Sequence, residues 1–591
     1  MEHYLSIEKS LQTEQSLLQS KKNKLSSLRL FLFIIAATCF VYYATSSNTI
    51  ALLGSLVFFI LLMIYVVKST KVTQQLLYTT QALTVIEEIK QEEKEDTFSE
   101  LNKEFQHHIY QKDLDILEGK SLFNRINKTQ TRLGNLQLKK ELTHLILDQS
   151  TIKERQQSFH EMEEKSAWNV KYLTLAQRIH VNQNTSFWFN EAIFKQAKIK
   201  YLPILYAAIN ICIFVWLCVE GFPKKKVFFW VVGAVFFSFL FNLIFKNKIA
   251  QVLSYTNMKG TELENLVQLF QHIENEDFKT KYVDQLKSKF IVNGEKASAL
   301  LQSLASTKET LDASQFPMVG FILNTMFLWR LYYVIQFEQE IQKTVHHINP
   351  WLQHVAEFET IISWAIFNTK HPSFTTPIVS DQPFEFKIKQ AFHPLLDESI
   401  AVKNDFETHR PNNITIITGA NMAGKSTFLR TIGTNLVLAM NGAHVSAEAF
   451  VFYPMNLFTS IRTVDNLASG DSYFKNEINK LKILIDLLAE GQPQFIILDE
   501  ILKGTNSQDK LIGSEKFLEK LKDYPTPLIC FIATHDLELT KMEEKYPSHL
   551  VNYCFELKNV NNNFFSDYKL RKGTTQVMNA IFLMKQFQII D

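Results

Sequence analysis

The sequence predicts an α/β domain with a parallel sheet, joined to an all-α core domain with four transmembrane helices in two hairpins. Three observations lead to this fold class. Four long apolar runs occur in two pairs, charged segments of helical spacing surround them, and short β-rich runs alternate with helical patterns after about residue 371. At 591 residues the chain is also too long for one hydrophobic core, so several units are expected.

Four long apolar runs are candidates for membrane spans. They cover Leu30–Ala44, Ile50–Val67, Leu202–Val219 and Val227–Phe245. The last three reach the ~18–20 residues that cross a bilayer, and the first is somewhat shorter. Buried core helices are the alternative interpretation, but the charges around the runs favour membrane spans.

Basic residues frame both pairs of apolar runs. The flanking residues are Lys21, Lys22, Lys24, Arg29, Lys68 and Lys71 for the first pair and Lys195, Lys198, Lys200, Lys246 and Lys248 for the second. The positive-inside rule places these flanks in the cytosol, although Lys224, Lys225 and Lys226 would then lie in an outer turn. Because the inner basic residues are more numerous, we expect a multi-pass protein of the cell (inner) membrane whose soluble parts face the cytoplasm.

A fifth apolar segment runs from Phe316 to Tyr333. It contains Asn324 and Arg330, which are costly in lipid. An odd number of spans would also place the carboxy-terminal domain outside the cell. We therefore expect this segment to form a buried cytosolic helix.

These elements divide the chain into six expected units. They are a cytosolic N-terminal helix (1–28), the first hairpin (29–68), the first part of a helical core (69–200), the second hairpin (201–246), the second part of the core (247–370) and the α/β domain (371–591). Lys and Arg number 62 against 60 Asp and Glu, so the composition neither predicts nor excludes nucleic-acid binding. The five cysteines show no metal or redox-pair spacing.

The stretch TGANMAGKSTFLRTIG, Thr418 to Gly433, contains a phosphate-binding pattern. Gly419, Gly424, Lys425 and Ser426 fit G-x-x-x-x-G-K-[ST], with the strand-like ITIIT before it and a helical run after it. Backbone N–H groups and the helix N-terminus hold the phosphates in such a loop. We expect Lys425 to reach the β and γ oxygens of ATP and Ser426 to ligate Mg²⁺.

Two later strand ends complete the expected site. In FIILDE, four apolar residues form a strand that brings Asp499 to the Mg²⁺ shell, and Glu500 can polarise the attacking water. The run ATHD ends a third strand, where His535 could sense the γ-phosphate. A packing or surface role is the alternative for this single histidine.

The segment ASGDSYFKNEI, Ala468 to Ile478, lies between the two Mg²⁺-binding motifs. A Ser-Gly pair that opens a helix could clamp a γ-phosphate through hydrogen bonds and the helix dipole. An ordinary N-cap at Ser469 or Asp471 explains the same residues. The segment alone leaves both interpretations open.

Taken together, these segments resemble the MutS family, the ATPases of DNA mismatch repair. TGANMAGKST is similar to the family form TGPNMGGKST, from which Ala420 and Ala423 depart. SGDSYFKNEI resembles the family signature segment, LDEILKGTNSQD its Walker B and D-loop, ATHD its switch and DYKLRKG the strand after the switch. Upstream, Leu122 to Phe159 and Leu352 to Ala365 resemble the start and the end of the family's helical core.

The resemblance implies a P-loop ATPase domain of the ABC/MutS type that uses ATP and Mg²⁺ and works as a homodimer with composite ATP sites. The implied nucleotide-binding residues are Gly419, Asn421, Met422, Gly424, Lys425, Ser426, Thr427 and, for the nucleotide of the other subunit, Ser472. Lys425, Glu500 and His535 would be catalytic, and Ser426 and Asp499 would hold the metal.

The sequence also departs from the family. No mismatch-reading domain fits before residue 115, and the second hairpin interrupts the core where relatives carry long levers and a DNA clamp. Membrane lipid is thus an expected partner and DNA a possible one, with no small-molecule substrate other than ATP. If DNA binds, we expect phosphate contacts through Lys139, Lys140, Lys153 and Arg155.

Two other functions remain as alternatives. An ABC-type transporter lacks support because the sequence has no LSGGQ and leaves little room for a helical subdomain between Lys425 and Asp499. A membrane-remodelling or scaffold ATPase that never acts on DNA is the stronger alternative. Binding of duplex DNA, with its characteristic salt dependence, separates it from a DNA-associated protein.

Overall fold

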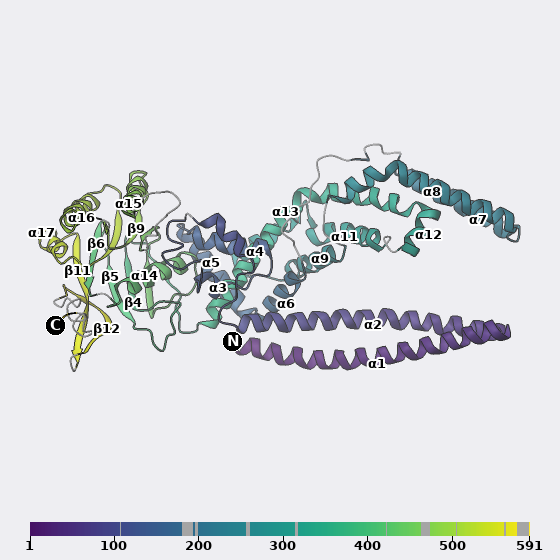
Figure 1. The fold of residues 1–591 in the computed structure, drawn as a ribbon, viewed down its shortest axis with the longest axis horizontal. Helices are drawn as coiled ribbons and strands as arrows, with labels where there is room; N and C mark the ends of the chain where they lie inside the picture. Colours follow the sequence, from purple (N-terminus) through teal and green to yellow (C-terminus); the bar gives the residue numbers. More distant parts are fainter. Residues whose placement is uncertain are drawn as a thin grey trace.

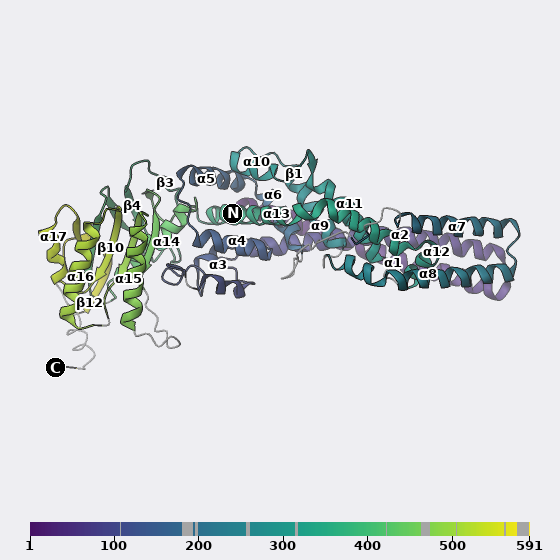
Figure 2. The ribbon, with the colours of Figure 1, turned by 90° about the horizontal axis from the view of Figure 1, so that it is seen from above.

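The computed structural model describes residues 1–106, 108–179, 193–194, 199–255, 260–313, 317–420, 422–461, 473–503, 505–560, 563–575 and 590. The α/β domain lies at one end of an elongated molecule, a helical bundle forms the middle, and two helical hairpins extend from the other end (Figure 1). A view turned by 90° gives the same order along the long axis (Figure 2).

The first hairpin consists of α1 (Glu2–Ser46) and α2 (Thr49–Lys90). Each is one continuous helix whose apolar run occupies the half next to the tip. The Asn48 side chain caps α2 by accepting the N–H of Ile50 at 3.0 Å. Arg29 Nη1 donates to Ser69 Oγ at 3.0 Å, so the two apolar runs end at the same level.

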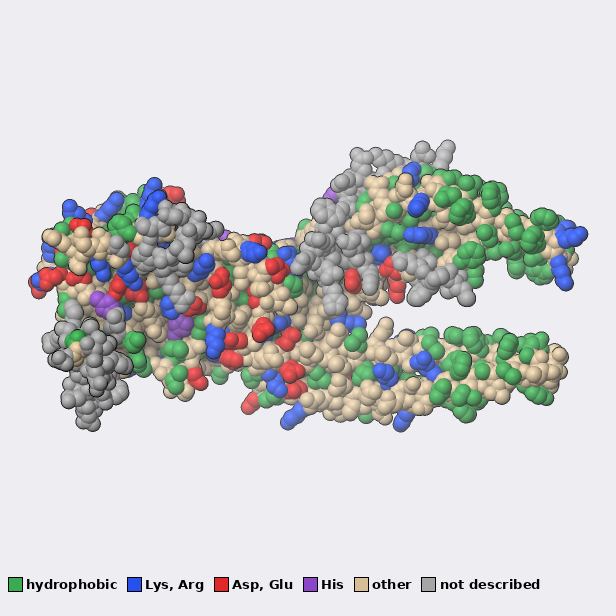
Figure 3. All heavy atoms as spheres, in the orientation of Figure 1, with side chains coloured by type: hydrophobic (Ala, Val, Ile, Leu, Met, Phe, Trp, Pro, Cys, Tyr) green, Lys and Arg blue, Asp and Glu red, His purple; other side chains and the backbone are tan. Residues whose placement is uncertain are grey.

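The second hairpin consists of α7 (Tyr201–Val219) and α8 (Lys224–Leu253), and its tip points the same way as the first tip (Figure 1). Exposed apolar side chains cover the outer parts of both hairpins, and basic side chains mark the tip of the second (Figure 3). On α8, for example, Phe228, Phe229 and Phe236 are at least 60% exposed. By length and composition, these four helices are long and apolar enough to cross a membrane.

The helical bundle is built from two segments that the second hairpin separates in sequence. The first contains the 3₁₀ helix η1 (Ser99–Phe105), α3 (Leu122–Ile126), α4 (Arg132–Thr143), α5 (Gln149–Glu164) and α6 (Ser166–Gln177). The second contains α9 (Gly260–Glu274), α10 (Lys281–Ser288), the short strands β1 (Ile291–Val292) and β2 (Glu295–Lys296), α11 (Ala297–Ala313), α12 (Pro317–Phe327) and α13 (Trp329–Lys370).

Helix α13 connects the two ends of the molecule. It begins beside the second hairpin, passes through the bundle and ends at Lys370, next to the α/β domain (Figure 1). Trp351 and Trp364 on it are buried, and the hydroxyl of Tyr172 on α6 donates to its Val355 carbonyl at 2.8 Å. These contacts fix α13 within the bundle core.

The expected single buried helix over Phe316 to Tyr333 is wrong. Leu328 has a left-handed backbone (φ 48°) and divides the segment into α12 and the start of α13. Asn324 Oδ1 accepts the N–H of Arg330 at 2.8 Å, which starts a new helix at this point. Phe321 and Ile322 are 60% and 56% exposed, so α12 is not buried either.

The α/β domain contains two sheets. The main sheet has the strand order β12-β11-β6-β10-β9-β8, in which all neighbours are parallel except the antiparallel pair β11 and β12. Its strands are β6 (Asn413–Gly419), β8 (Asn456–Ser460), β9 (Gln494–Asp499), β10 (Leu528–Thr534), β11 (Leu550–Val560) and β12 (Asn563–Lys572). The second sheet has the order β3-β7-β4-β5, with β3 (Ile378–Val379), β7 (Ala449–Phe452), β4 (Phe386–Ala391) and β5 (Asn404–Thr408).

Helices cover the main sheet on both faces, which explains the continuous apolar character of its central strands. The helices of this domain are α14 (Lys425–Met440), α15 (Tyr473–Ala489), α16 (Ser507–Lys522), the 3₁₀ helix η2 (Glu538–Lys541) and α17 (Met542–Lys545). Along β9, Phe495 and Ile497 pack into one hydrophobic cluster, and Ile496 and Leu498 into the other. This alternation holds the strand so that Asp499 emerges at its carboxyl end.

Buried polar contacts join the bundle to the α/β domain. Arg155 on α5 donates to the Asn441 carbonyl at 3.0 Å and pairs with Glu141 on α4 at 2.7 Å. Asp113 accepts hydrogen bonds from the Thr459 hydroxyl at 2.8 Å and the Ile461 N–H at 3.1 Å. Because unpaired buried charges are costly, these contacts oppose separation of the two parts.

Two of the four basic residues expected to contact DNA are therefore excluded from that role. Arg155 is buried against Glu141, and the Lys139 side chain is fully buried in an ion pair with Asp96 at 2.7 Å. Lys140 and Lys153 are exposed, although Lys153 lies 3.2 Å from a carboxylate oxygen of Asp381. The sequence could not reveal these burials, because both carboxylate partners approach through tertiary packing.

Candidate nucleotide-binding site

The phosphate loop connects the buried strand β6 to helix α14. Gly419 has φ 152°, and a Cβ there would lie 2.8 Å from the Phe555 carbonyl oxygen. Gly424 has φ 109°, which L side chains rarely adopt, and a Cβ there would lie 3.0 Å from the Tyr568 ring. Both glycines are thus required by the shape of the loop, and α14 directs its N-terminal N–H groups into it.

Lys425 is the first residue of α14 and points back over the loop. Its Nζ donates to the carbonyl oxygens of Gly419 at 2.7 Å and Ala420 at 3.1 Å. Burial lowers the pKa of Lys425 to about 8, against the attraction of Asp499 and Glu500. The ammonium group is therefore held by weak partners that a phosphate could replace.

Ser426 and Asp499 meet across the site. Ser426 Oγ donates to Asp499 Oδ2 at 2.5 Å, which brings the helix start and the end of β9 together. The register places Asp499 beside Ala533 of β10, which in turn pairs with Ile417 of β6. The three parallel strands therefore deliver their carboxyl ends to one edge, as expected for a ligand site in an α/β sheet.

Glu500 and His535 are hydrogen-bonded to each other within this edge. Glu500 Oε1 lies 2.8 Å from His535 Nε2, and this hydrogen bond lowers the pKa of Glu500 to about 2. Glu500 has a left-handed backbone (φ 53°), and its N–H donates to the Ala533 carbonyl at 2.9 Å. This arrangement turns the side chain toward the histidine instead of along the strand.

His535 cannot serve both of its neighbours with one nitrogen. Lys425 Nζ lies 3.1 Å from the same Nε2 that contacts Glu500. When Nε2 carries a proton it donates to Glu500, and when it does not it accepts from Lys425. The two charged residues therefore compete for the histidine.

These residues line one cavity of about 430 Å³. Of the residues predicted from the sequence, it brings together Met422, Gly424, Lys425, Ser426, Thr427, Asp499, Glu500 and His535. Gly419 contributes its carbonyl to Lys425 from below the loop. Asn421 and Ser472, also predicted, lie outside the described residues.

The cavity also contains residues that the sequence analysis did not assign. Lys503 and Tyr568 line it, and the Ser566 hydroxyl next to Tyr568 donates to the Ala423 carbonyl at 2.9 Å. The sequence offered a signal for Lys503 and Tyr568, because both lie in segments that carried the family resemblance, LDEILKGTNSQD and DYKLRKG. Lys503 was not assigned although it follows Glu500 by three residues, and Tyr568 was missed because only the fold places β12 over the phosphate loop.

Glu477 is a further residue that the sequence analysis missed. It lies on α15, within the signature segment, and is buried. Its carboxylate accepts the N–H groups of Leu502 at 2.5 Å and Lys503 at 3.0 Å. Helix α15 is thus bound directly to the loop that follows Asp499 and Glu500.

The polar groups fit a hydrated Mg²⁺ ion better than a closed metal site. The described residues contain no group of three or more His, Cys, Asp or Glu side chains that could hold a metal. Ser426 and Asp499 supply two adjacent oxygen atoms, and Mg²⁺ usually takes few protein ligands together with water and phosphate oxygens. These two residues would hold the ion beside the phosphates.

Comparison with known proteins identifies the carboxy-terminal region. Residues 415–586 match the family model of MutS domain V. This part of the chain is similar to MutS domain V. Because MutS domain V is an ATPase domain, the chain carries an ATPase.

The relatives of this MutS domain V agree with the match. The DNA mismatch repair protein MutS of Ehrlichia chaffeensis is 31% identical over 43% of this chain and 30% of its own length. MutS protein homolog 4 of Homo sapiens is 28% identical over 42% of the chain and 26% of its own length. The chain thus spans less than a third of the length of these curated relatives.

Proposed function

We propose that this chain is a membrane-anchored, MutS-like ATPase that works as a dimer. In this proposal α1, α2, α7 and α8 cross the membrane, and the MutS domain V lies on the cytoplasmic side. ATP binding closes the two ATPase domains, and the helical bundle transmits the motion toward the membrane or bound DNA. The observation that carries the proposal is the meeting of Lys425, Ser426, Asp499, Glu500 and His535 in one cavity.

Each of these residues has a role in the proposed hydrolysis. Lys425 and the first N–H groups of α14 hold the phosphates, and Ser426 with Asp499 holds Mg²⁺. The bound ion supplies positive charge that offsets the charge of the reacting phosphate. Glu500 orients the attacking water and accepts its proton, for which its hydrogen bond with His535 must first open.

Membrane insertion rests on the two hairpins. Their tips lie at the same end of the molecule, and exposed apolar side chains surround both (Figure 3). Alkaline carbonate washing of membranes tests the proposal, because it removes peripheral proteins and leaves spanning ones. Recovery of the full chain in the wash would contradict it, whatever the ATPase activity.

The proposed dimer rests on an open nucleotide site. Met422 in the phosphate loop is 91% exposed at the mouth of the cavity, a surface that a second copy could cover. We propose that Ser472 of one copy acts on the nucleotide of the other. Mixing a Ser472→Ala variant with a Lys425→Ala variant should then restore one intact site per heterodimer. No regained activity in verified heterodimers would rule out shared sites.

Association with DNA is a second proposal, supported by the similarity to DNA mismatch repair proteins. Lys140 and Lys153 remain exposed for phosphate contacts, whereas no described segment offers an evident wedge for a mismatch. We expect matched and single-mismatch duplexes to bind with affinities within about threefold of each other, and both to weaken steeply with salt. Titration of both duplexes at two salt concentrations tests this. Absence of duplex binding at low salt would favour a scaffold ATPase that does not act on DNA.

A further inference from the structure

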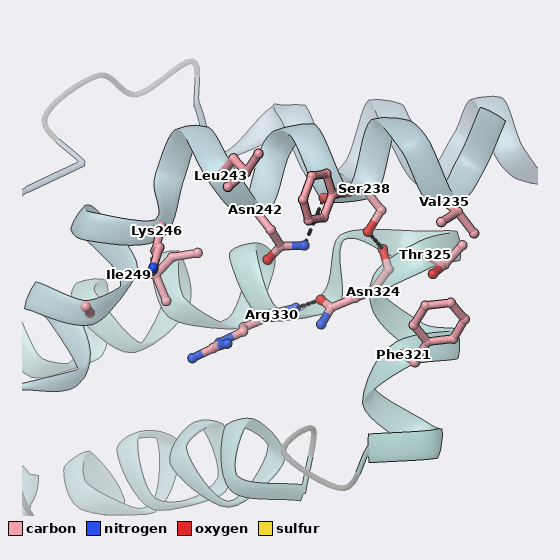
Figure 4. A pocket seen from close by; sticks show the side chains of 12 residues that line it. Val235, Ser238, Asn242, Leu243, Lys246, Ile249, Phe321, Asn324, Thr325 and Arg330 are labelled. Atoms are coloured by element: carbon pink, nitrogen blue, oxygen red, sulfur yellow. Dashed lines mark hydrogen bonds between the residues drawn. The ribbon is translucent and has the colours of Figure 1, made fainter. Parts of the chain in front are cut away.

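A pocket of about 580 Å³ lies where α8, α12 and the start of α13 meet (Figure 4). Lys246 and Arg330 lie at one end of it, and Phe321 and Val235 at the other end (Figure 4). Its walls are mostly apolar, and none of its lining residues is acidic. The pocket is therefore amphipathic, with a cationic end and an apolar end.

The polar backbone groups around the pocket are satisfied by the protein itself. Ser238 Oγ on α8 donates to the Asn324 carbonyl at 3.0 Å, and Asn242 Nδ2 donates to the Ser238 carbonyl at 2.9 Å. The side-chain oxygen of Asn324 is also occupied, by the N–H of Arg330. These bonds fix the broken segment between α12 and α13 as a rigid wall.

The two cations, in contrast, are available to a ligand. Among the residues that the structure describes, no carboxylate lies within ion-pair distance of Lys246 or Arg330, and both side chains are exposed. Arginine and lysine near each other, with no acidic neighbour in the pocket, favour an anion that accepts several hydrogen bonds. A phosphate group has this chemistry.

The position of the pocket along α8 indicates the rest of the ligand. Lys246 directly follows the apolar run Val227–Phe245, so the cations lie at the level where that run ends. From there the pocket extends alongside the run, where Phe239 and Leu243 are 62% and 55% exposed. An anionic head with an attached hydrocarbon chain matches both ends, whereas a free anion matches only one.

We propose that this pocket binds one acidic phospholipid, with the headgroup phosphate on Lys246 and Arg330 and an acyl chain along Phe239, Leu243 and Phe321. The inference rests on the proposed insertion of the second hairpin in a membrane. Helix α13 begins at the pocket and ends beside the MutS domain V, so the lipid would contact the element that links the membrane to the ATPase.

The test uses the full chain purified in a neutral detergent and titrated with phosphatidylglycerol, while native mass spectrometry counts bound lipid. Phosphatidylcholine and inorganic phosphate are titrated in parallel. We expect phosphatidylglycerol to bind preferentially, and Lys246→Gln and Arg330→Gln each to weaken this binding about fivefold. The double variant should bind phosphatidylglycerol about 25-fold more weakly than the wild type. Lys248→Gln, which removes the same charge from the same stretch of α8 outside the pocket, is the matched control.

Three outcomes would overturn the proposal. If Lys248→Gln weakened phosphatidylglycerol binding as much as Lys246→Gln or Arg330→Gln, overall charge, and not the pocket, would attract the lipid. Inorganic phosphate binding as tightly as phosphatidylglycerol would show a simple anion site. Equal binding of phosphatidylcholine would show that the cations do not select the headgroup.

Carbonate washing of the same protein distinguishes failure of the lipid-site proposal from failure of the proposed function. If carbonate washing leaves the protein in the membrane but phosphatidylglycerol shows no preference, only the lipid site is refuted. If the washing releases the protein, the membrane proposal fails and the lipid site fails with it. Circular dichroism of each variant confirms that the helices are retained.

Discussion

The candidate nucleotide site and the proposed lipid pocket lie toward opposite ends of the molecule (Figure 1), and they differ in how their charged groups are satisfied. In the nucleotide site Lys425, Ser426, Asp499, Glu500 and His535 already contact one another or the loop carbonyls. In the pocket, Lys246 and Arg330 have no acidic partner among the described residues. A ligand of the first site must therefore replace internal contacts and rearrange the protein, whereas a ligand of the second can fill a prepared space.

The largest expected effect comes from removing the central cation of the nucleotide site. Lys425→Ala should lower ATP hydrolysis about a thousandfold and weaken nucleotide binding, because the phosphates lose their main counter-charge. Steady-state hydrolysis and nucleotide titration measure both. Lys516→Ala, an exposed lysine on α16 of the same domain, should leave both unchanged. Wild-type turnover in Lys425→Ala would remove this lysine from the proposed mechanism.

A smaller loss is expected when only the proton acceptor is changed. Glu500→Gln should bind ATP but hydrolyse it about a hundredfold more slowly, since the amide keeps the shape of the carboxylate without its basicity. Nucleotide binding should not weaken, because the substitution leaves Lys425 and the phosphate loop intact and only loosens the contact of residue 500 with His535. Single-turnover hydrolysis with separately measured binding tests this, with Glu515→Gln on α16 as the control. Normal hydrolysis would mean that another residue positions the water.

The bundle between the two sites provides a prediction about pH. Glu359 on α13 is fully buried, and its carboxylate accepts the N–H groups of Gln130 and Thr131 at 3.1 and 3.2 Å. A Cβ on Gly134 would lie 1.8 Å from Glu359 Oε2, so the glycine makes room for this carboxyl group. Burial raises the pKa of Glu359 to about 7.

The sign of the effect follows from that pKa. Between the unfolded value near 4.5 and about 7, the folded state binds the proton more tightly than the unfolded state does. Stability from this group is therefore complete below about pH 4.5 and is lost as the pH rises through about 7, by roughly 3 kcal/mol. Melting temperatures of Glu359→Gln against wild type across this range should show a flatter profile. Glu357→Gln, two residues away, should keep the wild-type slope.

The smallest expected effect concerns the hydrogen bonds that support the pocket wall. The Tyr206 hydroxyl on α7 lies 2.9 Å from the carbonyl oxygens of Ala234 and Thr325, so it links α7 to α8 and α12. Tyr206→Phe should cost about 0.6 kcal/mol of stability, as is typical of hydrogen bonds between membrane helices. Thermal melting in detergent measures the loss, with the exposed Tyr201→Phe as the control. A loss of several kcal/mol would show that the helices around the pocket, like the residues of the nucleotide site, depend on a network of coupled contacts.

The sequence predicted which residues meet at the carboxyl edge of the sheet, because these residues follow strands at fixed positions. Asp499 and His535 each end an apolar run, and parallel strands bring such ends to one edge. Glu477 and Tyr568 lie in segments that carried the family resemblance, but their contacts could not be predicted, because only the fold brings these elements to the loops of the site. The break at Leu328 was missed for a similar reason, since a single side-chain bond from Asn324 overrides a continuous apolar pattern.

The length of α1 has a consequence for how two copies would meet. About 28 residues of this helix precede its apolar run, which corresponds to roughly 40 Å of rigid rod. In an inserted protein, this rod and α13 would hold every ATPase domain at one height above the bilayer. Encounters between copies would then be a two-dimensional search by lateral diffusion, and the surface density of the protein, more than its total amount in the cell, would set the fraction that is paired.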